Sequence, residues 1–258
     1  MESKFEIDMK RITIMILVAL FTISATNAQT SGNRRKMHTL PLPPKPKPDP
    51  ISKSKQTTTT SSPTPPKCGY INGYEWIDLG LSVKWATCNV GASSPSDYGG
   101  YYAWGETRTK SNYTLNNCFD SLDESGYNWG IYKVGSNTKI EPNSGHDTAR
   151  ENWGSTWRMP TIEELEELDR KCIWKWISNV GHNGYEVTGP NGNSIFLPAA
   201  GYRYDTSSVD VCEGGFYWSS TLDPSFSYIA SYLIFGSGGH YKDTYYRRLG
   251  LSVRPVTD

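Results

Sequence analysis

The segment from Ser225 to Arg248 carries the side chains best suited to contact a ligand. Its tyrosines and its histidine stand close to basic groups, and glycines between them predict turns. Tyrosine rings contact sugars by stacking and proteins by amphipathic packing, and they lose little rotamer entropy on binding. Alternatively, half of these rings alternate inward along a strand. The candidate ligand-binding residues are Tyr228, Tyr232, His240, Tyr241, Lys242, Tyr245, Tyr246 and Arg247.

The cysteines do not have the spacing of a metal site, because no Cys-x-x-Cys pair occurs among them. Five is an odd number, so at least one thiol stays free or pairs between molecules. We expect a disulfide between Cys88 and Cys172, because both lie on elements that should meet in the core. Alternatively, both are buried thiols. The five are Cys68, Cys88, Cys118, Cys172 and Cys212.

Other polar residues do not form a recognisable catalytic group. No histidine lies at metal-ligand spacing to another, and the motif Gly-x-Ser-x-Gly is absent. Carboxylates at Glu106, Asp120, Asp123 and Glu124 are more typical of solvated surface charge than of a glycoside-hydrolysing pair. The sequence therefore predicts no catalytic residue, no metal site and no cofactor. The four histidines are His38, His146, His182 and His240.

Arg158, Arg203 and Arg254 each lie inside an apolar motif. A buried guanidinium must be paired, so we predict that these arginines are structural. Their expected partners are carboxylates such as Asp147 and Glu164, or backbone carbonyls. Anion recognition in a pocket is the alternative.

The bulk composition limits the classes of partner. The 258 residues include 26 basic and 26 acidic side chains, so the formal net charge is zero. Nucleic acid is not expected as a partner, because phosphate binding needs a clustered basic surface. The chain has 17 Tyr and 9 Trp beside 7 Phe, and such rings suit both strands and binding surfaces.

Residues 1–28 have the parts of a secretory signal peptide. Basic residues precede the apolar run from Ile12 to Ile23, and we predict cleavage after Ala28. The run is too short to span a bilayer comfortably, so no stable membrane span is expected after cleavage; an uncleaved anchor is the alternative. Residues 29–67 are rich in Pro, Thr, Ser and Lys and predict a disordered linker. A proline-rich recognition motif or a glycosylated stalk is the alternative there.

The principal helix is predicted at about residues 161–177. Thr161 is suited to be its N-cap with Glu164 as the reciprocal partner, and Pro160 closes the preceding segment. Apolar residues then recur at spacings of three and four, which predicts a stripe facing a core. The stripe consists of Ile162, Leu165, Leu168, Cys172 and Trp176.

Strand patterns surround this helix. Runs at 74–79 and 81–86 flank Gly80, and runs at 184–188 and 194–197 flank a Pro-Asn-Gly turn that predicts a hairpin. Further strands are expected at 216–221, 228–235 and 251–256, the last only partly paired because of Pro255. Residues 105–150 predict mostly loops. One helix beside a twisted, mainly antiparallel sheet with long loops is an α+β domain at residues 68–258.

Six ordered motifs resemble the Fibrobacter succinogenes major paralogous domain, found in secreted and surface proteins of Bacteroides-like bacteria. Their order is also similar to that of domains with a C-type-lectin-like fold, including the formylglycine-generating enzyme domain. The motifs are Trp85–Ala92, Tyr102–Glu106, Trp153–Thr161, Phe196–Arg203, Tyr217–Ser220 and Ser252–Val256.

The resemblance implies a C-type-lectin-like domain at the cell surface and brings no activity with it. Formylglycine-generating relatives use late reactive cysteines, but residues 214–256 contain no Cys, which counts against an enzyme. Glu141-Pro142-Asn143 matches the calcium tripeptide of mannose-binding lectins, but it precedes the helix instead of following it. In lectin-like folds the region from Ser225 to Arg248 contributes to the ligand face.

These observations favour an exported binding module without enzymatic activity, placed outside the cell, on its surface or in the periplasm. Its expected ligand is a glycan or a surface protein, bound through C-terminal aromatic loops. The alternatives are an extracellular hydrolase or modifying enzyme, and a structural subunit of a surface appendage.

Overall fold

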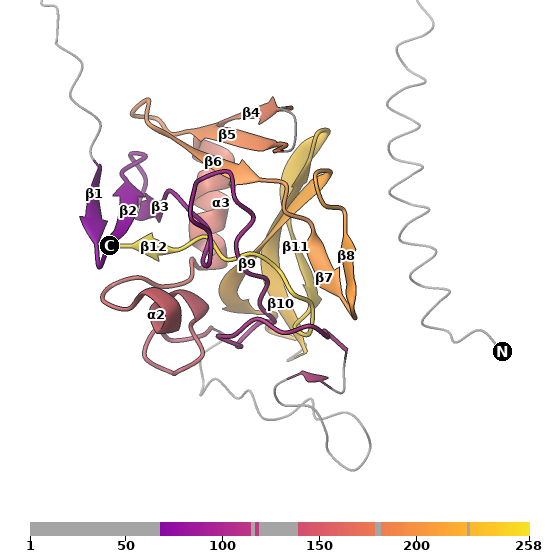
Figure 1. Ribbon diagram of the computed structural model, residues 1–258. Coiled ribbons are helices and arrows are strands. Elements are labelled where there is room, and N and C mark those ends of the chain that lie inside the picture. Colours follow the sequence, from indigo (N-terminus) through magenta and orange to yellow (C-terminus); the bar gives the residue numbers. More distant parts are fainter. Residues whose placement is uncertain (1–67, 115–116, 119–138, 179–181, 226–227) are drawn as a thin grey trace, which may run out of the picture. The chain divides into compact units, whose positions relative to one another are not determined.

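A computed structural model of the chain describes residues 68–114, 117–118, 139–178, 182–225 and 228–258 (Figure 1). The predicted signal peptide at 1–28 and the predicted linker at 29–67 lie outside these ranges. Within them, short antiparallel strands predominate and two helices accompany them, which agrees with the predicted α+β class. No helix in the described ranges is long and apolar enough to cross a membrane.

Strands from both ends of the described chain form one antiparallel sheet with the order β1-β2-β3-β12. In it Val256 lies opposite Trp85, so the last strand closes against the third. The predicted strand at 251–256 pairs only in part, because Leu251 and Ser252 form isolated bridges before β12 begins. The members are β1 (Cys68–Ile71), β2 (Tyr74–Ile77), β3 (Lys84–Ala86) and β12 (Val256–Thr257).

The remaining strands of the described ranges form two three-stranded sheets and one short hairpin. Their orders are β11-β10-β9, β4-β5-β6 and β7-β8, and every pairing is antiparallel. The predicted hairpin is confirmed as β5–β6, with Gly192 at a φ of 88° in its turn. The strands are β4 (Ile173–Ile177), β5 (Gly184–Thr188), β6 (Ser194–Pro198), β7 (Tyr202–Tyr204), β8 (Ser207–Val209), β9 (Gly214–Leu222), β10 (Ile229–Gly236) and β11 (Gly239–Tyr246).

Helix α3 (Ile162–Lys171) begins as predicted. The Thr161 side chain accepts from the backbone nitrogen of Glu164, whose carboxylate accepts from the backbone nitrogen of Thr161, so a complete capping box is formed. Leu165 and Leu168 are buried and anchor the helix on the core.

The predicted end of this helix at 177 is wrong. The helix stops at Lys171, Cys172 has an extended backbone, and the next five residues form strand β4. Trp174 and Trp176 alternate inward toward the core, and the strand pairs along its whole length with β5. The β-branched and aromatic residues of β4 suit a strand, and this pairing overrides the helical spacing.

Helix α2 (Thr148–Trp153) begins inside the region 105–150, where the sequence predicts mostly loops, and extends three residues beyond it. Asp147 caps it by accepting from the backbone nitrogen of Arg150, and its two carboxylate oxygens also accept from the backbone nitrogen of Met159 at 3.1 and 3.0 Å. Trp153 at its end stacks on Tyr74, with ring centroids 3.9 Å apart. A six-residue helix leaves too short an apolar pattern to be recognised from spacing.

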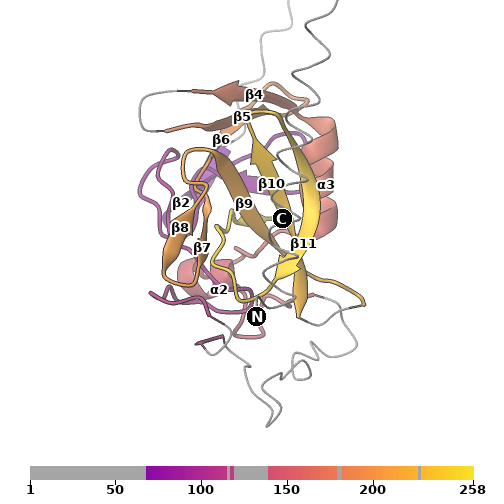
Figure 2. The same ribbon diagram turned by 90° about the vertical axis from the view of Figure 1, so that its right-hand side faces the viewer.

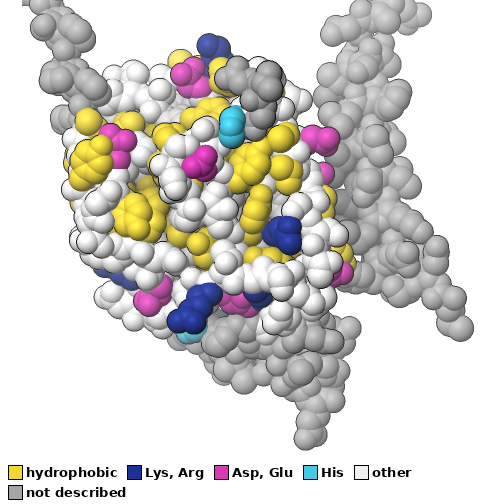
Figure 3. All heavy atoms as spheres, in the orientation of Figure 1, with side chains coloured by type: hydrophobic (Ala, Val, Ile, Leu, Met, Phe, Trp, Pro, Cys, Tyr) yellow, Lys and Arg dark blue, Asp and Glu magenta, His cyan; other side chains and the backbone are white. Residues whose placement is uncertain are grey.

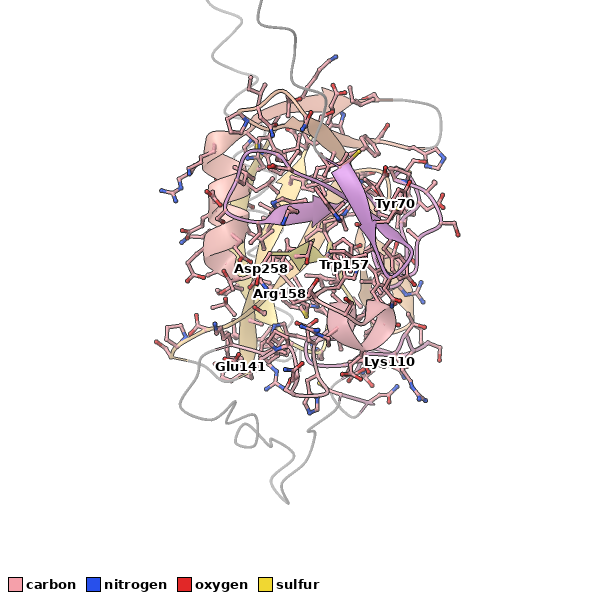
Figure 4. All side chains as sticks on the ribbon, turned by 90° about the vertical axis from the view of Figure 1, so that its left-hand side faces the viewer. Tyr70, Lys110, Glu141, Trp157, Arg158 and Asp258 are labelled. Carbon is pink, nitrogen blue, oxygen red and sulfur yellow. The ribbon has the colours of Figure 1, made fainter. Side chains whose placement is uncertain are left out.

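Two clusters of buried apolar side chains lie on the two sides of strands β9 and β10. The first lies toward α2 and includes Trp104, Trp157 and Trp218. The second lies under α3 and includes Leu168 and Phe235. In the view of Figure 4, Trp157 lies close to the first sheet, and its indole nitrogen donates to the carbonyl of Ile71 at 3.0 Å.

Candidate functional site

The C-terminal hairpin β10–β11 is the part of the structure that carries most of the predicted ligand-binding residues. The sequence places aromatic loops here, but residues 239–246 form a regular strand paired with β10 along its length. Side chains of a strand point alternately to opposite faces. The predicted site is therefore divided between two faces of one sheet.

One face of β11 is covered by α3. Nδ1 of His240 lies 2.5 Å from a carboxylate oxygen of Asp169 in α3, and Nζ of Lys242 contacts Glu166 in the same helix. The ring of His240 also stacks on Trp174, with centroids 4.3 Å apart. Two of the predicted ligand residues, His240 and Lys242, are therefore occupied by contacts within the domain.

The opposite face of the hairpin carries a continuous group of tyrosines that we call the tyrosine face. It continues from β11 across β10 and β9 to the β7–β8 hairpin, which lies beside β9 in Figure 2. Most of its rings are half-buried against the first core cluster, while Tyr241 is 51% exposed. The tyrosine face consists of Tyr202, Tyr204, Phe216, Tyr232, Ile234, Tyr241 and Tyr245.

The rings of the tyrosine face hold each other in place. Phe216 lies between Tyr202 at 4.8 Å and Tyr232 at 6.2 Å between ring centroids. Tyr245 meets Tyr232 edge-on at 6.5 Å. Rings fixed by such contacts have little freedom left to lose when a ligand binds.

Charged groups border the tyrosine face. The guanidinium of Arg248 lies over the rings of Tyr204 and Tyr246, at 5.5 and 5.3 Å from their centroids. Tyr246 in turn stacks on Tyr228 at 6.0 Å, so these two predicted ligand residues form a pair at the end of β11. Asp243 is exposed on the same face of β11 as Tyr245.

Two other predicted ligand residues are buried and serve as support. Tyr232 is 5% exposed within the first core cluster. Arg247 is 8% exposed, and its guanidinium lies 4.9 Å from the ring centroid of Trp104. Neither side chain offers much surface to a ligand.

Burial raises the pKa of three tyrosines of the tyrosine face. It raises the pKa of Tyr202 to about 12, and it raises the pKa of Tyr241 and of Tyr245 as well. A tyrosine hydroxyl is protonated at neutral pH even at its ordinary pKa of about 10, and these shifts act in the same direction. Each can donate one hydrogen bond and accept others.

Sequence reasoning missed the contribution of β7 and β9 to this face. Tyr202, Tyr204, Phe216, Ile234 and Arg248 join it although the sequence did not single them out as ligand residues. The alternation Tyr-Arg-Tyr directly after a glycine was the available signal, because it indicates a strand with two rings on one side. That glycine, Gly201, has a φ of 64°, and a Cβ there would lie 2.2 Å from the carbonyl oxygen of Val209.

The structural arginines have different partners. Arg158 makes hydrogen bonds of 2.8 and 2.7 Å to both carboxylate oxygens of Glu164, as expected, and also contacts Asp258 (Figure 4). Arg254 is 1% exposed and donates to Asn89 and to backbone carbonyls. Burial lowers the pKa of Arg254. Arg203 is only half-buried and bonds Ser208 and a backbone carbonyl instead of a carboxylate.

The predicted disulfide is not formed. All five cysteines lie in the described ranges and all are free thiols. Cys88 packs against the first core cluster and Cys172 against the second, on the other side of the β9–β10 strands. Burial raises the pKa of the Cys172 thiol to about 11, so it is unreactive at neutral pH. Both residues are partly buried, whereas the alternative expectation was that they are buried thiols.

The described residues assemble no cluster of potential metal ligands. In those residues, no three His, Cys, Asp or Glu side chains come together as metal ligands, and this includes Glu141.

Asp147 is the partner that sequence reasoning assigned to an arginine, but it accepts from backbone nitrogens instead. Burial raises the pKa of Asp147 to about 6.

Comparisons of the chain with protein-family models, with curated proteins and with solved structures gave no match. The class of protein is therefore defined by its fold alone: it is an α+β domain built on small antiparallel sheets. The resemblance to the Fibrobacter succinogenes major paralogous domain stays a prediction from sequence.

Proposed function

We propose that the protein is an exported, non-enzymatic binding module that recognises a glycan through the tyrosine face. The alternative ligand is a protein of a cell surface. The observation that carries the proposal is the set of rings that β7, β9, β10 and β11 present on one side of the sheet, with Tyr241 half-exposed at its edge. The signal-like residues 1–28 support export.

A glycan suits the chemistry of this surface. Flat, fixed rings can stack on the apolar faces of sugars, and protonated tyrosine hydroxyls can bond sugar hydroxyls as donors and as acceptors. Arg248 and Asp243 add a donor and an acceptor at the border. Since strands carry the rings, the surface needs little ordering before it binds.

We further propose that the domain has a C-type-lectin-like fold. Two features support this assignment: the first and last strands of the described chain share one sheet, and a capped helix precedes the C-terminal strands. The six sequence motifs support it too. In lectin-like folds the C-terminal strands contribute to the ligand face, which agrees with the position of the tyrosine face.

A glycan array probed with the full-length protein tests the proposal. The parent should bind a subset of glycans with saturation, and the double variant Tyr241→Ala, Tyr245→Ala should bind them at least about tenfold more weakly. Tyr70→Ala is the matched control, because Tyr70 is 71% exposed on β1, in a different sheet. Its removal should leave binding unchanged.

Three outcomes would contradict the proposal. Binding that weakens equally in the control would mean that exposed rings act without a defined site. The control is needed because hydrophobic side chains reach the surface in several places on the side seen in Figure 3. Absence of glycan binding together with capture of one surface protein through the same tyrosines would favour the alternative ligand. Turnover of a polysaccharide, lost on changing one carboxylate, would indicate an enzyme.

A further inference from the structure

Strand β4 is an edge strand of the β4-β5-β6 sheet. It pairs with β5 from Ile173 to Ile177, and its other edge lies at the outside of the described domain in both Figure 1 and Figure 2. The backbone N–H and C=O groups along such an edge can pair with another strand. A short, apolar edge strand is therefore a docking surface for an extended chain.

The sequence of β4 is a palindrome, Ile-Trp-Lys-Trp-Ile, centred on Lys175. Trp174 and Trp176 point inward and pack against the second core cluster. Ile173, Lys175 and Ile177 occupy the other face, and Ile173 is 73% exposed. That exposure is the largest among the large hydrophobic side chains of the described residues.

We infer that two copies of the chain associate by antiparallel pairing of β4 with β4, which joins their sheets into one of six strands. The palindrome selects the register in which Lys175 faces Lys175 of the second copy. Each Ile173 then lies opposite Ile177 of the other copy on the outer face, and each Trp174 lies opposite Trp176 on the inner face. A shift by two residues would place Ile173 opposite Lys175 and lose this matching.

Charge at the centre of the pairing is balanced within each copy. Nζ of Lys175 lies 3.9 Å from a carboxylate oxygen of Glu186 on β5. The row across the four central strands is thus Glu, Lys, Lys, Glu, in which each ammonium keeps an acidic neighbour. Both side chains are well exposed, so the repulsion between the two ammonium groups is screened by solvent.

Strand β11, an edge strand of another sheet, has a protected edge. β11 has a run of exposed residues, Tyr241 to Thr244, that includes both a basic and an acidic side chain and has no palindrome. Charged side chains on an edge strand oppose its pairing with another strand. β4 has one charge, already paired with its neighbour, between apolar residues.

The association should be weak and reversible. One pair of five-residue strands buries far less than the roughly 1,200–2,000 Å² of a stable interface. The inference does not depend on the proposed function, because β4 and the tyrosine face belong to different sheets.

Sedimentation equilibrium of the full-length protein, in reducing buffer and over a wide concentration range, tests the inference. The parent should show a monomer–dimer equilibrium. Lys175→Glu places four acidic groups in a row with Glu186 of both copies, so it should weaken dimerisation at least tenfold. Lys139→Glu is the matched control with the same charge change at an exposed position outside β4, and it should dimerise like the parent.

Cross-linking tests the register directly. Residues that face each other in an antiparallel pair have Cα atoms within the range that a disulfide spans. Under mild oxidation, Lys175→Cys should therefore form a disulfide-linked dimer in excess of the background that the five native thiols give in the parent and in Lys139→Cys. A parent that stays monomeric at all concentrations, or a dimer unaffected by Lys175→Glu and not trapped by Lys175→Cys, would overturn the inference.

Discussion

The two faces of the hairpin β10–β11 have similar side chains but opposite surroundings. The face under α3 has its histidine and lysine bound to Asp169 and Glu166, and its apolar residues are closed over by the helix. The tyrosine face has rings half-buried against the first core cluster, and α3 packs on the other side of the sheet. The comparison teaches that covering, and not composition, distinguishes a supporting face from a candidate binding face.

The largest difference in stability between the two faces is expected at two adjacent residues of β10. Leu233 is 1% exposed under α3, whereas Ile234 is half-buried on the tyrosine face. Leu233→Ala should lower the free energy of unfolding by about 3 kcal/mol, because a buried leucine leaves a cavity. Ile234→Ala should lower the free energy of unfolding by about 1 kcal/mol. Urea denaturation of the two variants measures both values, and equal losses would contradict the distinction between the faces.

A pH titration sharpens the comparison next, because Asp147 is a buried carboxylate that accepts from the backbone nitrogen of Met159 in the first core cluster. Asp147 is fully buried and its pKa is raised to about 6 by burial, from an ordinary value of 3.8. The folded state therefore holds this proton more tightly than the unfolded state. The resulting stabilisation is present below about pH 4 and is lost as the pH rises through about 6.

Asp147→Asn isolates this effect, since the amide oxygen can still accept a hydrogen bond and does not titrate. The difference in unfolding free energy between the parent and the variant should change by about 2 kcal/mol between pH 4 and pH 7.5, with the parent relatively more stable at the lower pH. Chemical denaturation at both values measures it. A difference independent of pH would mean that Asp147 titrates normally.

The ion pairs on the covered face should contribute least. Lys242 is 61% exposed in its contact with Glu166, so a double-mutant cycle of the two alanine variants should give a coupling of about 0.2–1 kcal/mol. High salt should reduce the coupling further. A coupling well above this range at high salt would indicate that α3 is held on β11 mainly by charge.

Local signals explain what could be predicted from the sequence. The start of α3 depends on Thr161 and Glu164, which are three residues apart, and the β5–β6 turn depends on Gly192 and its neighbours. Both were predicted because the physical cause lies within a few residues. The strand class of β9 and β10 followed from their apolar runs in the same way.

Long-range packing explains what the sequence did not predict. Ile173 to Ile177 are compatible with either a helix or a strand, and pairing with β5 decides the outcome. His240 and Lys242 look like ligand residues until α3 is placed beside them. Tyr202 and Tyr204 become part of the candidate site only because the β7–β8 hairpin lies next to β9. The Cys88–Cys172 disulfide was expected because the two residues were taken to meet in one core. No local signal in the sequence indicates that they pack against two separate core clusters.

The most direct test of the tyrosine face compares two neighbouring residues that point to opposite faces. Titration calorimetry with a glycan identified on the array would be performed on Tyr241→Ala and Lys242→Ala in parallel. We expect Tyr241→Ala to weaken binding at least about tenfold and Lys242→Ala to bind like the parent. Equal weakening by both changes, or weakening by Lys242→Ala alone, would contradict the account.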